Sequence, residues 1–283
     1  MERAARTVVG GYVASPKASG RAATLTAVAL LRRPGAFCLA MAAFFAAVLF
    51  ADRYVDEQQQ LLLGAATWAV LLVSCRGLGP ERLAQVALVV VAATCTEVVG
   101  SILWGVYEYR LGNLPAFVPP GHGLVYLTGL RLSECAFVRR RPRPFVCSVL
   151  AISLLWTVAG LTVLPRLDVA GALGAATFAV CLLWGRAPTI YAGVFVAVAG
   201  LEWYGTAVGT WRWAETIPGL GIPDGNPPSG VASGYVLFDV IALALTPVLL
   251  RLVRRRSDAV ENPPQPGQPP AAVREPEAAS TNA

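Results

Sequence analysis

Residues 97–109, EVVGSILWGVYEY, decide the fold, because they place a carboxylic acid inside an apolar run and begin a pattern that occurs twice. The second copy is residues 202–213, EWYGTAVGTWRW, about 105 residues later. In each copy a glycine follows the Glu by three positions, and two aromatic residues stand at alternate positions near the end. Ionisable groups at bilayer depth are costly, so both acids are candidate functional residues.

The composition indicates an integral membrane protein. The chain is 55% hydrophobic and 14% charged, with a mean hydropathy of +0.57. Several apolar runs reach the length of a membrane span. The single lysine, Lys17, lies in the N-terminal arm, which excludes a retinal Schiff base or a lysine nucleophile inside the bilayer. The six cysteines have no metal-ligand spacing, and we expect reduced packing residues.

We predict an all-α integral membrane protein with about eight transmembrane helices. The apolar runs that define these spans are 35–51, 61–76, 83–106, 121–138, 145–164, 169–185, 188–210 and 231–252. The predicted organisation is a cytoplasmic N-terminal arm at 1–34, a first four-helix repeat at 35–143, a second at 144–256 and a disordered cytoplasmic tail at 257–283, which is rich in Pro and Glu.

An internal repeat extends beyond the acidic motif. The sequence LGAAT at residues 63–67 recurs at 173–177, and nine of the fourteen positions from 63–76 are identical in 173–186. Four spans per half is an even number, so both halves have the same orientation in the membrane. The sequence therefore predicts a parallel 4+4 duplication.

The distribution of arginine predicts the orientation. Arginine clusters flank the spans mainly on one side, which includes both chain ends, and few arginines lie on the other. Because cytoplasmic loops are rich in Lys and Arg, we expect a multi-pass protein of the cell membrane with both termini in the cytoplasm. The net charge of +6 reflects this topology. The expected partners are membrane lipid and a lipophilic small molecule, and no nucleic acid.

Each aromatic pair is followed by a loop with a Pro-Pro step and then by another apolar run that carries a charge. The charge is Arg131 in the first copy and Asp239 in the second. Counted at 1.5 Å per residue, Glu97 lies about 15 Å below the outer end of its helix, and we expect Glu202, Arg131 and Asp239 at a similar depth. His122, the only histidine, is expected at the outer mouth of the site.

Several of these residues also fit purely structural roles. Arg131 is three residues before Glu134 and would be neutralised by it, or it pairs with Asp239 as a lock between the halves. The aromatic pairs also fit an ordinary aromatic belt at the membrane interface. A lone histidine at a helix start is often a hydrogen-bonded cap. The two acids are harder to explain structurally, because after a duplication without a function for both, one of them could be replaced by Gln or Ala.

The pattern suits acid catalysis on an alkene. A carboxylic acid in an apolar cavity holds its proton and can donate it to a carbon–carbon double bond. Trp and Tyr rings stabilise the resulting cation, and a second carboxylate or His122 would position water or remove the final proton. No nucleotide-binding loop, Ser/His/Asp order, HExxH motif or Asp-rich diphosphate motif occurs in the sequence. These absences argue against kinase, hydrolase, zincin and diphosphate-ionising chemistry.

The candidate residues fall into two groups. The candidate catalytic residues are Glu97, Glu202, Asp239, His122 and Arg131, with Glu202 or Asp239 as proton donor, Glu97 as its counterpart and Arg131 setting the charge balance. The candidate substrate-binding residues are Trp104, Tyr107, Tyr109, Tyr126, Trp211, Trp213, Tyr235 and Asn226. We expect no metal site and no cofactor.

At these motifs the chain resembles the carotenoid hydratase family, which includes the bisanhydrobacterioruberin hydratases. The resemblance covers about 60 residues in two blocks and is carried by Glu97, Gly100, Gly105, Tyr107, Tyr109, Trp211, Trp213, Gly221-Ile222-Pro223 and Asn226. Pro119-Pro120 and Pro227-Pro228 depart from the family pattern. The resemblance implies a lyase of carotenoid biosynthesis that adds water to a terminal isoprenoid double bond. A membrane terpene cyclase, a proton- or cation-coupled transporter and a non-catalytic scaffold are the alternatives.

Overall fold

The computed structural model describes residues 33–261. The N-terminal arm with Lys17, and the tail beyond residue 261, lie outside the described residues. The described chain is mainly helical, with two short strands and connecting loops. Its first part contains α2 (Pro34–Asp52), α3 (Glu57–Ser74), α4 (Pro80–Glu97), the π-helix η1 (Val98–Trp104), β1 (Tyr107–Tyr109), α5 (Val118–Glu134) and α6 (Ala136–Arg140). Its second part contains α7 (Pro142–Thr162), α8 (Val169–Trp184), α9 (Pro188–Val208), β2 (Trp211–Trp213) and α10 (Ala232–Glu261).

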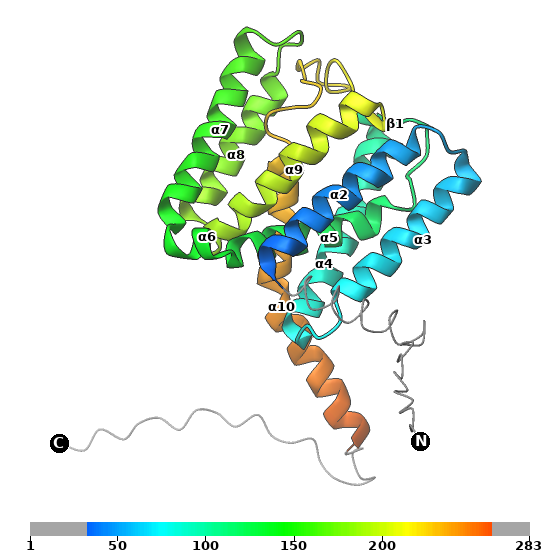
Figure 1. The fold of residues 1–283 in the computed structure, drawn as a ribbon, viewed down its shortest axis with the longest axis vertical. Helices are drawn as coiled ribbons and strands as arrows, with labels where there is room; N and C mark the ends of the chain where they lie inside the picture. The colour runs from blue at the N-terminus through cyan, green and yellow to red at the C-terminus, as the bar shows by residue number, and fades with distance from the viewer. Residues whose placement is uncertain (1–32, 262–283) are drawn as a thin grey trace, which may run out of the picture.

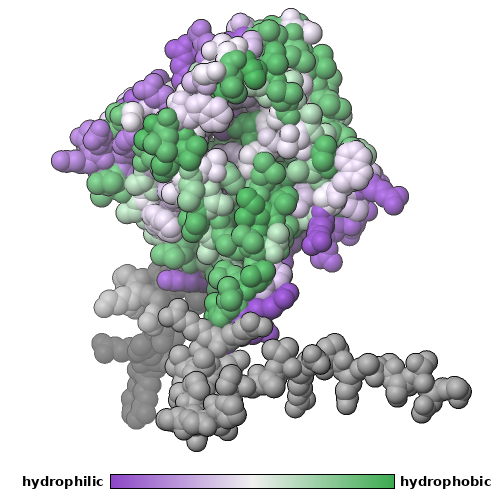
Figure 2. All heavy atoms as spheres, turned by 180° about the vertical axis from the view of Figure 1, so that it is seen from behind, coloured by the Kyte–Doolittle hydropathy of each residue, from purple (hydrophilic) through white to green (hydrophobic). Residues whose placement is uncertain are grey.

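Among the described residues, five helices are long and apolar enough to cross a membrane. They are Pro34–Asp52, Pro80–Trp104, Pro142–Thr162, Pro188–Val208 and Ala232–Arg254. The other three predicted ranges are also helical. α8 is apolar but short, and α3 and α5 are not among the helices that are both long and apolar enough to cross a membrane. Apolar residues cover much of the surface in Figure 2, with hydrophilic residues mainly toward the edges and the lower end. The molecule therefore has the character of a membrane protein.

The helix starts follow local sequence rules. Proline occupies the first turn of α2, α4, α5, α7 and α9, where the missing N–H has no helical partner to lose. Asp56 and Gln59 form a capping box at the start of α3, and Asp168 caps α8 by accepting from Gly171 N. Each of these starts follows from the sequence close to it.

A two-stranded antiparallel ribbon joins the two copies of the motif. Tyr107 pairs with Trp213, and Tyr109 pairs with Trp211. Gly105 (φ 74°) and Gly209 (φ 81°) end the preceding helices in the left-handed conformation, which glycine adopts without strain. The span predicted over 83–106 corresponds to α4 and η1, which together cover Pro80–Trp104, and β1 follows directly after it.

The most extensive contacts between helices join the first part of the chain to the second. α5 packs against α9, and α10 packs against α4 (Figure 1). Gly129 of α5 and Gly193 of α9 face each other, and a Cβ at Gly193 would lie 2.5 Å from the Gly129 carbonyl oxygen. These two glycines therefore allow the backbones of α5 and α9 to approach closely.

The predicted tail boundary differs from the structure. α10 continues to Glu261, so residues 257–261, predicted as the start of a disordered tail, are helical. The apolar run that predicted the span ends near residue 252, but a helix continues past its apolar segment as long as nothing in the sequence breaks it. Figure 1 shows this end of α10 at the opposite end of the molecule from the two paired strands β1 and β2.

Candidate functional site

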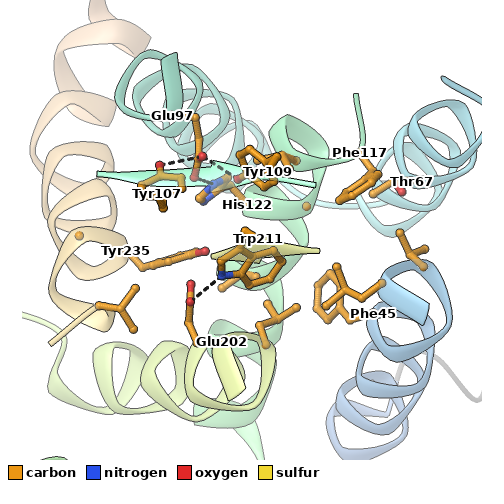
Figure 3. A pocket seen from close by; sticks show the side chains of 18 of the residues that line it. Phe45, Thr67, Glu97, Tyr107, Tyr109, Phe117, His122, Glu202, Trp211 and Tyr235 are labelled. Carbon is orange, nitrogen blue, oxygen red and sulfur yellow. Dashed lines mark hydrogen bonds and ion pairs between the residues drawn. The ribbon is translucent and has the colours of Figure 1, made fainter. Parts of the chain in front are cut away.

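A cavity of about 170 Å³ lies beneath the ribbon, enclosed by α2, α4, α5, α9 and α10 (Figure 3). We call it the carboxyl cavity, because both Glu97 and Glu202 line it. Most of its wall is aromatic or aliphatic. The lining residues predicted from sequence are Glu97, Tyr107, Tyr109, His122, Glu202, Trp211, Trp213 and Tyr235.

Glu97 has hydrogen-bond partners at both carboxyl oxygens. The hydroxyls of Tyr107 and Tyr109 donate to Oε2 at 2.8 and 2.7 Å. Oε1 lies 2.9 Å from His122 Nε2, and both side chains are buried. The hydrogen bond between the imidazole and the carboxyl group satisfies two polar groups that would otherwise be costly to bury. Glu97 and His122 therefore form a buried acid–imidazole pair on one wall of the cavity.

Glu202 is held differently. The indole N–H groups of Trp211 and Trp213 donate to its Oε2 at 2.9 and 3.1 Å. Within the described residues no hydrogen bond is found for its other oxygen, Oε1, and no cation or imidazole contacts this acid. The same motif thus holds one acid by two phenols and an imidazole, and the other by two indoles alone.

The glycine three residues after each acid makes room for the ribbon. A Cβ at Gly100 would lie 3.1 Å from the Tyr107 ring, and a Cβ at Gly205 would collide with the Trp211 indole. The aromatic side chains can therefore lie against the helix and reach back to the acids. The aromatic pairs are hydrogen-bond donors to Glu97 and Glu202, which a simple interfacial belt would not require.

His122 lies deeper than predicted. It is 4% exposed and contacts Glu97, so it neither caps the helix nor stands at the outer mouth. The physical reason is that α5 begins at Val118, which puts His122 one turn inside the helix and facing the cavity. Its ring stacks on Tyr235 (centroids 4.8 Å apart) and meets Phe238 edge-on.

Tyr235 lies between the two acids in Figure 3 and lines the cavity. No hydrogen bond from its hydroxyl is found within the described part of the chain. Its hydroxyl is therefore a polar group of the cavity that neither acid engages.

Two predicted catalytic residues do not reach the cavity. Arg131 pairs with Glu134 at 3.0 Å near the end of α5, which is the neutralising role that its sequence spacing allowed. Asp239 is 1% exposed on α10, but it does not line the cavity, and its Oδ2 has no partner among the described residues. The proposed lock between Arg131 and Asp239 is therefore absent from this structure. Asp239 lies one turn beyond Tyr235 on nearly the same side of α10, and the part of this helix that lines the cavity ends at Phe238.

Three predicted substrate-binding residues also lie elsewhere. Trp104 is 48% exposed and donates to the Pro218 carbonyl, because η1 displaces it from the α-helical face of Glu97. Tyr126 is buried and donates to Gln85. Asn226 accepts from the backbone N–H of Trp213 at 3.0 Å, so it supports the ribbon and does not line the cavity.

Several cavity residues carry no sequence pattern that could have identified them. They are Phe44, Phe45, Thr67, Thr96, Phe117 and Phe238. Each lies in an apolar helix or beside one, where an inward residue and a lipid-facing residue look alike. The described residues contain no cluster of three or more His, Cys, Asp or Glu that could hold a metal ion.

The ribbon tyrosines keep their protons. Burial raises the pKa of Tyr107 above its ordinary value, and Glu97 raises it further. Burial and then Glu97 act in the same direction on the pKa of Tyr109. Both hydroxyls therefore remain hydrogen-bond donors to Glu97 throughout the physiological pH range.

Comparison of this chain with protein-family models, with curated proteins and with solved structures gives no match.

Proposed function

We propose that this chain is an integral membrane enzyme that adds water to a carbon–carbon double bond of a lipophilic isoprenoid. The observation that carries the proposal is the unequal pair of acids in one apolar cavity. Glu97 is engaged at both oxygens and paired with His122, whereas Glu202 keeps one oxygen free toward the cavity. Groups with opposed environments are suited to opposite roles in proton transfer.

In the proposed reaction, Glu202 is the proton donor. Its proton adds to the less substituted carbon of the terminal double bond, and the other carbon becomes a tertiary cation. The rings of Trp211 and Tyr107 face the cavity and stabilise this cation. Water bonds to the cation and gives a proton to the Glu97–His122 pair. Tyr235 gives a proton to Glu202 and takes one from the Glu97–His122 pair, so every enzyme group returns to its starting state and the net change is the addition of one water molecule.

The carotenoid hydratase resemblance is part of this proposal, and so is the duplicated architecture. Corresponding elements recur in order, with α2, α3, α4 with η1, β1 and α5 matched by α7, α8, α9, β2 and α10. We propose that they are two parallel four-helix halves forming eight spans, with the ribbon on the outer side of the cell membrane. Two acids from one ancestral motif then acquired different partners.

The test of this function is Glu202→Gln in a lycopene-producing host. Glutamine keeps an oxygen that accepts from the indoles, so the fold is retained, but it carries no transferable proton. The wild type should yield a product 18 mass units heavier than lycopene, and the variant should lose about 10²–10⁴-fold in rate, the range for general-acid catalysis. Mass spectrometry of lipid extracts measures both.

Glu108→Gln is the matched control. Glu108 is an exposed acid on β1 between the two tyrosines, so the same chemical change at this position should leave the rate unchanged. A fully active Glu202→Gln protein would overturn the assignment. A product of unchanged mass would instead identify a cyclase that uses the same acids.

One observation favours a second function, proton- or cation-coupled transport. η1 interrupts regular α-helix directly after Glu97, and helices interrupted near a buried acid are typical of transporters. This function predicts substrate-dependent proton flux in proteoliposomes, with no new product. Hydration remains our proposal because the interruption is occupied by the ribbon contacts of Gly100 and Tyr107 and opens no polar path.

A further inference from the structure

A second cavity lies beside the carboxyl cavity. It has a volume of about 410 Å³ and is bounded by α2, α5 and α9. Its walls are almost wholly apolar and include the small residues Ala42, Ala46, Ala197 and Gly200. Leu39 at its edge is 75% exposed, so this cavity reaches the outer surface of the helices. We call it the side groove.

The side groove and the carboxyl cavity share part of their walls. Phe45 and Leu49 of α2 and Leu201 of α9 line both of them. α2 and α9 contact each other and run side by side in Figure 1. The two spaces are therefore neighbours across three side chains, and rotation of these side chains would join them.

The hollow at Gly200 is not needed for helix packing. A Cβ at Gly200 would meet nothing within 4 Å, whereas a Cβ at Gly129 or Gly193 would collide with the facing helix. A glycine in a helix interior destabilises the helix by about 1 kcal/mol relative to alanine. At Gly129 and Gly193 this cost permits close packing, and at Gly200 it keeps a space open.

The carboxyl cavity is too small for a whole long-chain substrate. Sites for small molecules usually measure roughly 300–1,000 Å³, and the carboxyl cavity measures about 170 Å³. It suits the end of a chain. The remaining chain of a lipophilic substrate needs an apolar channel that leads toward lipid, and the side groove provides one at the shared wall.

We propose that the side groove holds the aliphatic chain of a long acyclic isoprenoid while the terminal double bond of that molecule occupies the carboxyl cavity. This inference rests on the proposed function and adds its substrate class and route of access. Phe45, Leu49 and Leu201 are then the gate between chain and reacting end. Substrates that lack a long chain leave the side groove empty.

The test measures lycopene retained by purified protein, which needs no turnover. Glu202→Gln is the background, so that bound lycopene is not consumed. Gly200→Leu in this background fills the side groove and should lower the lycopene retained per mole of protein by about ten-fold, which corresponds to about 1.4 kcal/mol. Gly35→Leu is the matched control, because Gly35 is also a helical glycine with open space around it but lies near the start of α2.

A folding check accompanies this measurement. Thermal unfolding should show that Gly200→Leu is folded. If it is not, Ala46→Leu fills the side groove from the opposite wall and should give the same loss of lycopene.

The outcomes separate the two proposals. Unchanged retention in folded Gly200→Leu, or no lycopene retained by Glu202→Gln itself, overturns the side-groove inference. Loss of a bound phospholipid with unchanged lycopene, seen by native mass spectrometry, would assign the groove to lipid and also overturn it. Lycopene that is retained, and lost on filling the groove, without any hydrated product from the wild type would support the groove and contradict the proposed function.

Discussion

Asp224, in the loop after β2, is a buried acid with one carboxyl oxygen that has no hydrogen-bond partner among the described residues. Its neighbour Asp168 accepts backbone N–H bonds from Gly171, Gly225 and Ser229. Asp224 accepts only from Gly225 N, and its Oδ2 has no partner among the described residues. Burial raises the pKa of Asp224 to about 7, and the nearby Asp168 carboxylate contributes in the same direction.

The sign of the resulting pH dependence follows from linkage. An unfolded Asp titrates near pH 4, so between about pH 4 and 7 the folded loop binds a proton that the unfolded chain has lost. The stability contributed by this group is complete below about pH 4 and is lost as the pH rises through 7. We expect Asp224→Asn to stabilise the protein at pH 8 and to stabilise it clearly less at pH 5, as measured by thermal unfolding in detergent.

Asp56→Asn serves as the control, because Asp56 is an exposed acid whose capping role asparagine retains. Equal stabilisation of Asp224→Asn at both pH values would show that Asp224 is ionised in the folded protein at pH 5 and would contradict the prediction.

The two-stranded ribbon brings the two copies of the repeated motif together and so forms the site. Its strands are only three residues each, and each pairs with a partner about a hundred residues away. Nothing within Tyr107–Tyr109 specifies that partner, so sequence reasoning predicted the two acids and the four aromatic residues but not their hydrogen bonds. It also missed η1, because an apolar run is compatible with an α-helix and a π-helix alike.

The glycines beneath the ribbon predict an unequal response to one substitution. Gly205→Ala should push the Trp211 indole away from Glu202 and reduce stability by roughly 1–3 kcal/mol, the usual range for overpacking. Gly100→Ala meets the Tyr107 ring at 3.1 Å, where a few tenths of an ångström of movement suffice, so its effect should be below about 1 kcal/mol. Thermal unfolding and the tryptophan emission spectrum would measure the difference.

Equal damage from both glycine substitutions would contradict this interpretation of the geometry. Gly200→Ala is the control for the alanine change itself, because its Cβ enters open space and should stabilise the helix slightly.

At the scale of the whole molecule, matching elements have diverged in what they contribute. Pro119-Pro120 lie in the first turn of α5, whereas Pro227-Pro228 precede α10, and α5 supplies His122 to Glu97 while α10 supplies Tyr235 between the acids. Counting residues from the helix ends predicted a similar depth for Glu97 and Glu202, and both residues line one cavity. This counting was not enough for Arg131 and Asp239, because the cavity ends at Val125 on α5 and at Phe238 on α10, before either residue.

The two ends of the molecule differ in their arginines. At the ribbon end, Arg110 pairs with Asp52, and Arg166 and Arg212 pair with Glu215. At the other end, Arg82 and Arg131 pair with Glu134, and four arginines of α6 and the next residues have no ion pair among the described residues. They are Arg139, Arg140, Arg141 and Arg143. Because cytoplasmic flanks are rich in Lys and Arg, we propose that the ribbon end faces outward.

Cysteine labelling in intact cells tests this orientation. In a background without the six native cysteines, Leu220→Cys places an exposed thiol at the ribbon end, and Phe137→Cys places one on α6. A membrane-impermeant maleimide should label Leu220→Cys directly and Phe137→Cys only after permeabilisation, which makes the second variant the control for reagent exclusion. The reverse pattern would invert the proposed topology. It would leave the carboxyl cavity intact but place the ribbon that covers it on the cytoplasmic side.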